Sequence, residues 1–288
     1  MLVREENDKI VPKLIQFGDP VARVSTLCIH LQSAEERKAF AVNKEDHTSP
    51  IIGTISDKNE ELEKAVAEQI NGGDAWLEGH TPALLDRIAR DHDITVNQIA
   101  DFDLSLYDTQ TPQVGGMNGE FLYSARLDNL ATVFCAVESL AAHDCANDRD
   151  VSLIVCFDHE EVGSTSANGA GSPVMADALK RIAAALGTSG SSSSNNLTPD
   201  DYSATIAKSF CLSIDQAHAV HPNYASKHEA QHSPVMNGGI VIKTNSNQRY
   251  TTNSLTGFVV RELGRKCGVP IQEFCGACIW EFWRRAES

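Results

Sequence analysis

The sequence lacks any hydrophobic run that approaches the roughly 18–20 apolar residues of a membrane-spanning helix. Its first residues are mostly charged and lack the apolar core of a signal peptide. Basic residues are also few, because 24 Lys and Arg stand against 39 Asp and Glu, a formal net charge of −15. This balance argues against a protein that binds nucleic acid or an anionic membrane surface, since both need a basic patch.

Disulfide patterning is lacking as well. The eight cysteines are scattered over 288 residues, several of them inside apolar runs. A small domain held by disulfides would show denser, regularly spaced cysteines. We therefore expect a reducing, cytoplasmic location. The sequence also has no G-x-S-x-G segment, which argues against a serine hydrolase with a nucleophile elbow.

The residues that are present predict an α/β fold, because short apolar runs alternate with amphipathic stretches. Expected strands lie at residues 21–31, 50–55, 151–157, 210–214 and 239–244. Expected helices lie at residues 57–70, 82–89, 93–100, 126–143, 173–186 and 253–266, and a mobile loop is expected at 189–196. Glycine pairs near residues 115–119 predict a boundary, with one domain over residues 1–117 and another over residues 118–288.

Three acidic segments each follow an apolar run or open a helix, the edge at which open α/β sheets bind ligands. Asp128 stands in the first turn of an expected helix, where the helix dipole alone would favour an acid. Glu160 and Glu161 directly follow the apolar run 151–157 and precede a glycine-rich stretch. Neighbouring side chains on an extended loop point apart, so one glutamate is able to bind a metal while the other faces water.

The third segment holds Asp215, the natural metal ligand of its loop, together with His218 and His221. A lone H-x-x-H pair more often orients ligands through hydrogen bonds than binds metal itself, so both interpretations stay open for these two histidines. His228 and His232 have helical spacing, but nothing near them completes a zinc-peptidase motif. We do not expect them to be ligands.

Together these segments resemble those of the aspartyl aminopeptidases, a branch of the two-metal aminopeptidases. The resemblance lies in residues 126–129 (RLDN), 158–164 (DHEEVGS), 215–224 (DQAHAVHPNY) and 243–250 (KTNSNQRY). It also includes residues 22–31 (ARVSTLCIHL) and extends to about residue 274. Residues 275–288 resemble no segment of that family and form an atypical tail.

The resemblance implies a role for each matched position. Asp128 would bridge two zinc ions, Asp215 would bind the first and Glu161 the second. Glu160 would be the general base that deprotonates the bridging water. The remaining implied positions contact substrate: Lys243 would pair with the acidic side chain of an N-terminal Asp or Glu, Tyr250 would close the same segment, and His30 would reach a neighbouring subunit's active site.

The implied fold is a three-layer α/β catalytic domain with an inserted β-rich dimerisation domain, here residues 1–117, and the implied assembly is a dodecamer built from dimers. The implied substrates are peptides with an acidic first residue. The family also implies one histidine ligand per zinc, and neither has a counterpart in the 288 residues, so we expect a chain incomplete at both ends. The alternative is a catalytically inactive subunit that acts as an interaction protein with complete subunits.

Overall fold

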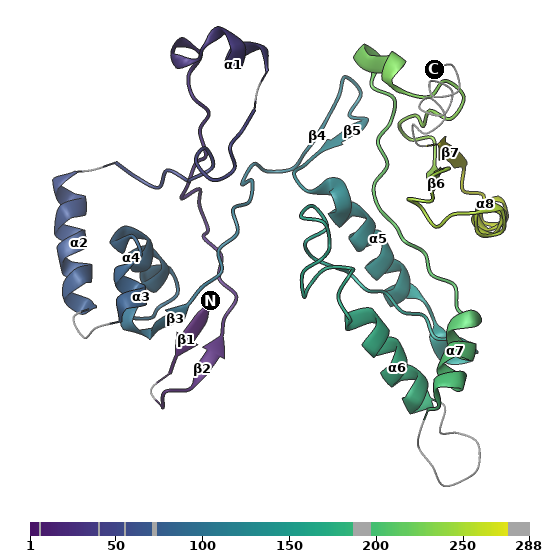
Figure 1. The fold of residues 1–288 in the computed structure, drawn as a ribbon, viewed down its shortest axis with the longest axis horizontal. Helices are drawn as coiled ribbons and strands as arrows, with labels where there is room; N and C mark the ends of the chain where they lie inside the picture. Colours follow the sequence, from purple (N-terminus) through teal and green to yellow (C-terminus); the bar gives the residue numbers. More distant parts are fainter. Residues whose placement is uncertain (6, 40, 55, 71–73, 187–196, 276–288) are drawn as a thin grey trace. The chain divides into compact units, whose positions relative to one another are not determined.

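The computed structural model describes residues 1–288 except 6, 40, 55, 71–73, 187–196 and 276–288 (Figure 1). The loop expected at 189–196 and nearly all of the atypical tail lie outside these residues. The chain divides into two compact units, Met1–Ala125 and Arg126–Ser288. This division falls eight residues beyond the boundary expected at 117, since 125 − 117 is 8. The dimerisation and catalytic roles of the two parts stay predictions.

The first unit contains a small antiparallel sheet with strand order β2-β1-β3, formed by β1 (Leu2–Arg4), β2 (Ile10–Pro12) and β3 (Ile99–Asp101). A separate antiparallel pair joins β4 (Gln113–Gly115) to β5 (Phe121–Tyr123). The α-helices are α1 (Ala34–Lys38), α2 (Asp57–Gln69), α3 (Ala75–Glu78) and α4 (Pro82–Asp91), and 3-10 turns cover Ile29–Leu31 and Val96–Gln98.

Helix α4 organises the core of this unit. Pro82 occupies its first turn, where a missing N–H costs nothing, and Leu85, Ile88 and Ala89 share its buried face. These three pack into a continuous apolar cluster with residues of α2 and its C-terminal cap, of α3, of the Val96–Gln98 turn and of β3: Val66, Ile70, Leu77, Val96 and Ile99. The core of the first unit is therefore built by helices closing on one side of β3.

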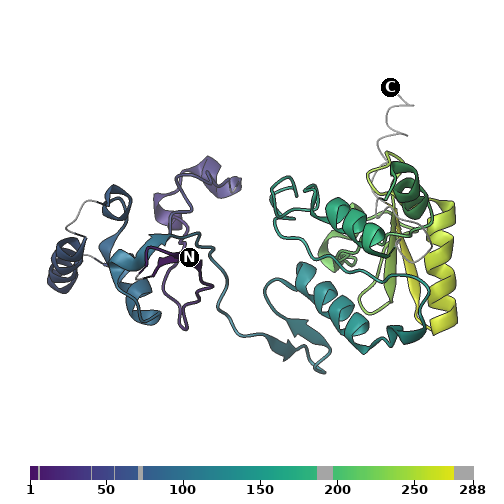
Figure 2. The same ribbon diagram turned by 90° about the horizontal axis from the view of Figure 1, so that it is seen from below.

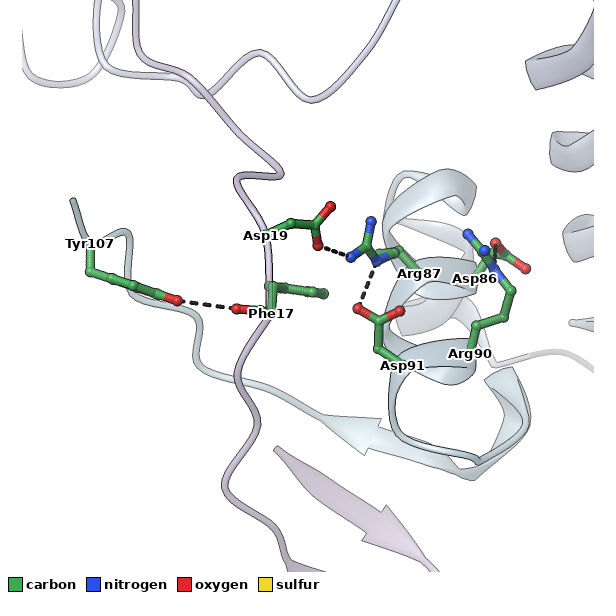
Figure 3. Close-up of polar contacts among 7 residues, drawn as sticks. All are labelled: Phe17, Asp19, Asp86, Arg87, Arg90, Asp91 and Tyr107. Atoms are coloured by element: carbon green, nitrogen blue, oxygen red, sulfur yellow. Dashed lines mark hydrogen bonds and ion pairs between the residues drawn. The ribbon is translucent and has the colours of Figure 1, made fainter. Parts of the chain in front are cut away.

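The solvent side of α4 carries ion pairs (Figure 3). Arg87 bridges Asp91 one turn later, at 2.6 Å, and Asp19 of the preceding extended segment. The Tyr107 hydroxyl donates to the Phe17 carbonyl at 3.1 Å. The segment that contains Phe17 and Asp19 is therefore bound both by Arg87 of α4 and by Tyr107, which follows β3 in the chain. These contacts fix the extended chain around residues 16–19 against α4.

The second unit contains most of the longer helices and one parallel strand pair. Its α-helices are α5 (Leu127–Ala142), α6 (Val174–Leu186), α7 (Pro199–Ala207) and α8 (Ser254–Cys267), with 3-10 turns at Cys145–Asn147 and Pro222–Lys227. Strands β6 (Ile240–Thr244) and β7 (Ile271–Cys275) pair in parallel, with Lys243 opposite Phe274. A strand, a crossover helix and a second parallel strand form the unit typical of α/β folds, which confirms the expected fold class.

Helix α8 connects the end of β6 to the start of β7 and packs against the two strands (Figure 2). Asn253 caps its start by accepting from two backbone N–H groups, and Gly268 ends it in the left-handed conformation with φ +68°. Gly264 permits close packing, because a Cβ atom there would lie 2.6 Å from Cγ1 of Ile271. The expected helix 253–266 and the expected strand 239–244 are both confirmed.

Several expected strands are wrong. Residues 151–157 and 210–214 run without regular secondary structure, and within the described ranges neither pairs with a neighbouring strand. The described part of residues 21–31 and 50–54 has one isolated bridge, between Arg23 and Ile51, in place of the expected strands, and residue 55 lies outside the described residues. An apolar run indicates burial, but a strand also needs a hydrogen-bonded partner. Residues 93–100, expected as a helix, form a 3-10 turn and then enter β3. Among the described residues, no helix is both long and apolar enough to cross a membrane.

Candidate active site

Asp128 lies at the irregular start of α5. The backbone is left-handed at Arg126 (φ +59°) and departs from helical geometry at Asp128 and Asn129, so the regular helix begins at Leu130. The sequence predicts Asp128 within a regular first turn, and this detail is wrong. The irregular backbone leaves the Asp128 side chain exposed at the end of the helix, where it is able to meet other segments.

Two hydrogen bonds join this helix end to the segment that carries Asp215. The side-chain amide of Asn129 donates to the Ile214 carbonyl at 3.3 Å, and that of Gln216 donates to the Thr132 hydroxyl at 2.6 Å. Each bond spans more than eighty positions of sequence. They bring the two predicted zinc ligands, Asp128 and Asp215, to one place.

The charges of this place raise the pKa of Asp128 above its ordinary value. The largest cause is a hydrogen bond with the Asp215 carboxyl, followed by slight burial and by the negative charges of Asp215, Glu161 and Glu160. The other three acids that the sequence singles out therefore lie within electrostatic reach of Asp128. We call Asp128, Glu160, Glu161 and Asp215 the acidic cluster.

Glu160 and Glu161 are held in a tightly folded loop. The Gly163 N–H donates to the Glu160 carbonyl and the Ser164 N–H to the His159 carbonyl, each at 2.9 Å. Gly169 packs directly on the loop, because a Cβ atom there would lie 2.3 Å from the Ser164 carbonyl oxygen. The glycine-rich sequence thus lets the loop close on itself and present both glutamates at the surface.

Lys243, at the end of β6, points into the acidic cluster. Its Nζ lies 3.4 Å from Oδ2 of Asp215 and donates to the Gln216 carbonyl at 3.0 Å. The lysine side chain is half-buried, with 24% of its surface exposed, so its charge is partly desolvated beside the carboxylate. The structure therefore places the predicted substrate-binding cation directly on a predicted zinc ligand.

The nearby histidines make structural contacts. His218 packs edge-on against Phe274 of β7, with ring centroids 4.9 Å apart. Nδ1 of His221 accepts from the Asn223 N–H at 3.2 Å, and the His221 N–H donates to Nε2 of His228 at 3.2 Å. Of the two interpretations left open by the sequence, these contacts favour supporting roles over metal binding.

Two predicted site residues take no part in the contacts described above. His30 is exposed in the 3-10 turn Ile29–Leu31 of the first unit. Tyr250 is half-buried in the second unit, beyond β6. Their substrate-binding roles stay predictions.

The chemistry of the acidic cluster suits divalent cations. Its carboxylate oxygens are ligands that zinc accepts, and a cation would offset the repulsion between the ionised carboxylates. Among the residues that the structure describes, however, no three His, Cys, Asp or Glu side chains converge closely enough to hold one ion. The cluster thus contains oxygen ligands of the right chemical type. In the structure, however, the Asp215 carboxylate is engaged by a hydrogen bond and an ion pair with neighbouring residues.

Sequence reasoning missed the residues that hold the cluster together, namely Asn129, Thr132 and Gln216. Asn129 and Gln216 lie inside the matched segments, but nothing in their pattern identifies a partner. Thr132 follows Asp128 by four residues, a spacing that would place both on one face of a regular helix, and this is the one sequence signal that marks it.

The parallel strand pair, its crossover helix and the acidic cluster at the ends of α/β elements define a metallopeptidase-like α/β protein. Residues 1–277 match the family described as "Aminopeptidase I zinc metalloprotease (M18)". The chain belongs to this family.

The chain is similar to two curated relatives in particular. It is 41% identical to "Probable aspartyl aminopeptidase" of Ricinus communis, over 97% of this chain and 60% of the relative. It is 40% identical to "Aspartyl aminopeptidase 4" of Saccharomyces cerevisiae, over 94% of this chain and 58% of the relative. The chain thus spans about three-fifths of the length of these relatives.

Solved structures confirm the zinc-aminopeptidase fold. A cryo-EM structure of the Ape4 and Nbr1 complex matches with a TM-score of 0.73 and 35% identity, over 95% of this chain and 50% of that one. A crystal structure of prApe1 matches with a TM-score of 0.78 and 26% identity, over 95% of this chain and 55% of that one. The family and the fold agree with those implied by the sequence motifs.

Proposed function

We propose that this chain carries the active-site carboxylates of a zinc-dependent aminopeptidase that removes N-terminal Asp or Glu from peptides. The observation that carries the proposal is the gathering of Asp128, Glu160, Glu161 and Asp215 around one helix end, with Lys243 among them. The names of the curated relatives, which are aspartyl aminopeptidases, support the substrate class.

Within this proposal, Asp128 would contribute to both zinc sites, Asp215 would help to hold the first ion and Glu161 the second. Bound zinc lowers the pKa of a coordinated water and polarises the scissile carbonyl. Glu160, adjacent to the ligand Glu161 on a tightly turned loop, takes the proton from the attacking water and passes it to the leaving amine. Asn129 donates a hydrogen bond to the Ile214 carbonyl and so keeps Asp128 and Asp215 close together.

Lys243 selects the substrate by pairing with the acidic side chain of the first residue. Its partial burial strengthens such a contact, because a half-desolvated ammonium attracts a carboxylate more strongly than one in water. Tyr250 closes the same segment of substrate contacts, and His30 contributes from a neighbouring subunit. The proposal therefore includes a homo-oligomer that assembles through the first unit. It also includes a cytoplasmic location for the enzyme.

A solved structure of the same fold, described as "Structure of S. cerevesiae mApe1 dodecamer", supports the proposed homo-oligomer. The alternative of an inactive interaction subunit gains no support from the curated relatives, because their printed names are those of enzymes.

Release of free aspartate from an Asp-initiated peptide tests the proposal. We expect the purified 288-residue chain to release aspartate with zinc and to stop when a chelator is added. An Ala-initiated peptide of the same length is the matched substrate, and we expect slower cleavage of it. Equal release with and without the chelator would contradict the zinc mechanism.

A further inference from the structure

Helix α8 has one side against β6 and β7 and another side turned away from them (Figure 2). Two buried glycines, Gly257 and Gly264, belong to the inner side. Large apolar side chains stand on the outer side and stay exposed: Leu255 at 71%, Phe258 at 53% and Leu263 at 50%. We call these three the outer stripe. A helix that is apolar on both sides normally has both sides covered, so the outer stripe indicates a docking surface.

The contacts of α8 with β7 show where the chain leaves the strand pair. A Cβ atom at Gly264 would lie 2.6 Å from Cγ1 of Ile271, the first residue of β7. Three residues earlier on α8, Arg261 forms an ion pair at 2.8 Å with Glu273, two residues later on β7. The helix and the strand therefore run in opposite directions. At about 3.3 Å per strand residue and 1.5 Å per helix residue, the end of β7 at Cys275 lies beside the first two turns of α8.

The segment that follows Cys275 is rich in large apolar residues. Residues 276–288, outside the described part of the chain, read GACIWEFWRRAES. Four large apolar residues occupy five consecutive positions, which we call the aromatic segment: Ile279, Trp280, Phe282 and Trp283. The three residues 276–278 are enough to span about 10 Å, the diameter of an α-helix. The aromatic segment is therefore long enough and close enough to reach the outer stripe.

We propose that the aromatic segment docks on the outer stripe of α8 in the same chain. Tryptophan and phenylalanine bury more apolar area than most side chains, which suits an uncovered apolar stripe. A tether of three residues gives the segment an effective concentration of roughly millimolar at this surface, which a separate partner would have to exceed. The inference depends only on the β6-α8-β7 element and the sequence that follows it, and it is independent of zinc and of peptide cleavage.

Tryptophan fluorescence tests the inference, because the chain has three tryptophans and two of them lie in the aromatic segment. Trp76→Phe removes the third, which packs edge-on against Phe102 in the first unit. Trp280 and Trp283 then remain as the reporters in an otherwise unmutated 288-residue chain. The measured quantities are the emission maximum and the quenching by acrylamide, first in the native chain and then in concentrated guanidinium chloride.

In the Trp76→Phe chain, we expect emission at shorter wavelength and weaker quenching in the native state than in the denatured state, because docking removes the two indole rings from water. Phe258→Ser should shift the native emission to longer wavelength and raise the quenching toward the denatured level. Leu255→Ser, at the more exposed position, should act in the same direction and keeps the test decisive if Phe258→Ser does not fold. Equal quenching in the native and denatured states would overturn the inference.

Phe134→Ser is the matched control, because Phe134 of α5 is also an exposed phenylalanine, at 65%. It should leave both signals unchanged, and far-UV circular dichroism should show the same helix content in all variants. A change equal to that of Phe258→Ser would overturn the assignment of the outer stripe.

A mixing experiment separates docking within one chain from docking on a second copy. The Phe258→Ser chain is refolded together with an excess of chains that carry Trp76→Phe, Trp280→Ser and Trp283→Ser, which keep the outer stripe but give no signal. We expect the tryptophans of the Phe258→Ser chain to stay accessible to acrylamide. Recovery of their protection would assign the outer stripe to the tail of another copy and would overturn the inference.

Discussion

At the scale of single residues, Asp215 is the point where the contacts of the site converge. Its carboxyl raises the pKa of Asp128, pairs with Lys243 and accepts from the Gln216 backbone N–H. A carboxylate with three such partners has its orientation fixed by its surroundings. The acidic cluster is therefore organised around Asp215, although Asp128 is the proposed bridging ligand.

Glu160 and Glu161 are adjacent, yet their proposed roles differ, and substitution separates them. Glu160→Gln should keep zinc binding and lower turnover by at least the roughly 10²–10⁴-fold that is usual for loss of a general base. The measurements are zinc content and the rate of aspartate release. Glu138→Gln, an exposed change on α5, is the control and should leave both unchanged. Undiminished turnover in Glu160→Gln would exclude it as the base.

Lys243 determines selectivity if it pairs with the acidic side chain of the substrate. Lys243→Ala should reduce the preference for Asp- over Ala-initiated peptides by about 1.5–3 kcal/mol, the usual contribution of a hydrogen bond to a charged group. The comparison is kcat/KM for the two peptides, and Lys180→Ala on α6 is the control. Equal losses of kcat/KM on both peptides would instead indicate that Lys243 acts by holding Asp215, whose Oδ2 lies 3.4 Å from the lysine Nζ.

At the scale of elements, α4 determines the stability of the first unit because its buried face forms the centre of the core. Leu85 is completely buried there. Leu85→Ala should lower the free energy of unfolding by about 2–5 kcal/mol, through lost burial and the cavity left behind. Denaturant unfolding measures the change. Leu104→Ala is the control, because 37% of Leu104 is exposed, and a loss as large as that of Leu85→Ala would contradict this account of the core.

The elements also show how far sequence reasoning reaches. The helix 253–266 and the strand 239–244 were predictable because capping residues and short apolar runs are local signals. Residues 151–157 and 210–214 carry the same apolar signal without a strand, because pairing depends on residues distant in sequence. The approximate place of the acidic cluster was likewise predictable, since its acids follow apolar runs.

The contacts within that cluster were not predictable. The bond between Gln216 and Thr132 spans 84 positions, and that between Lys243 and Asp215 spans 28. No periodicity or motif relates residues so far apart. Local chemistry therefore predicts which residues carry function, while the three-dimensional structure alone identifies the residues that position them.

At the scale of the whole molecule, the two units differ in how they are held together. The first has a continuous apolar core, whereas Ile242, with 6% of its surface exposed, is the one buried large apolar side chain among the described residues of the second. Large apolar side chains stay exposed on the second unit, including Phe134, Leu255 and Phe258. The unit that carries the acidic cluster is thus arranged chiefly by polar contacts and by the β6-α8-β7 element.

The central claim is that the carboxylates of this chain bind zinc, and the zinc content of the chain after dialysis tests it most directly. The unmutated chain should retain zinc, and Asp128→Ala should retain none, because the proposed bridge contributes to both sites. Asp177→Asn removes an exposed acid of α6 in the same unit and should leave zinc content unchanged. Zinc retained in full by Asp128→Ala would contradict the account.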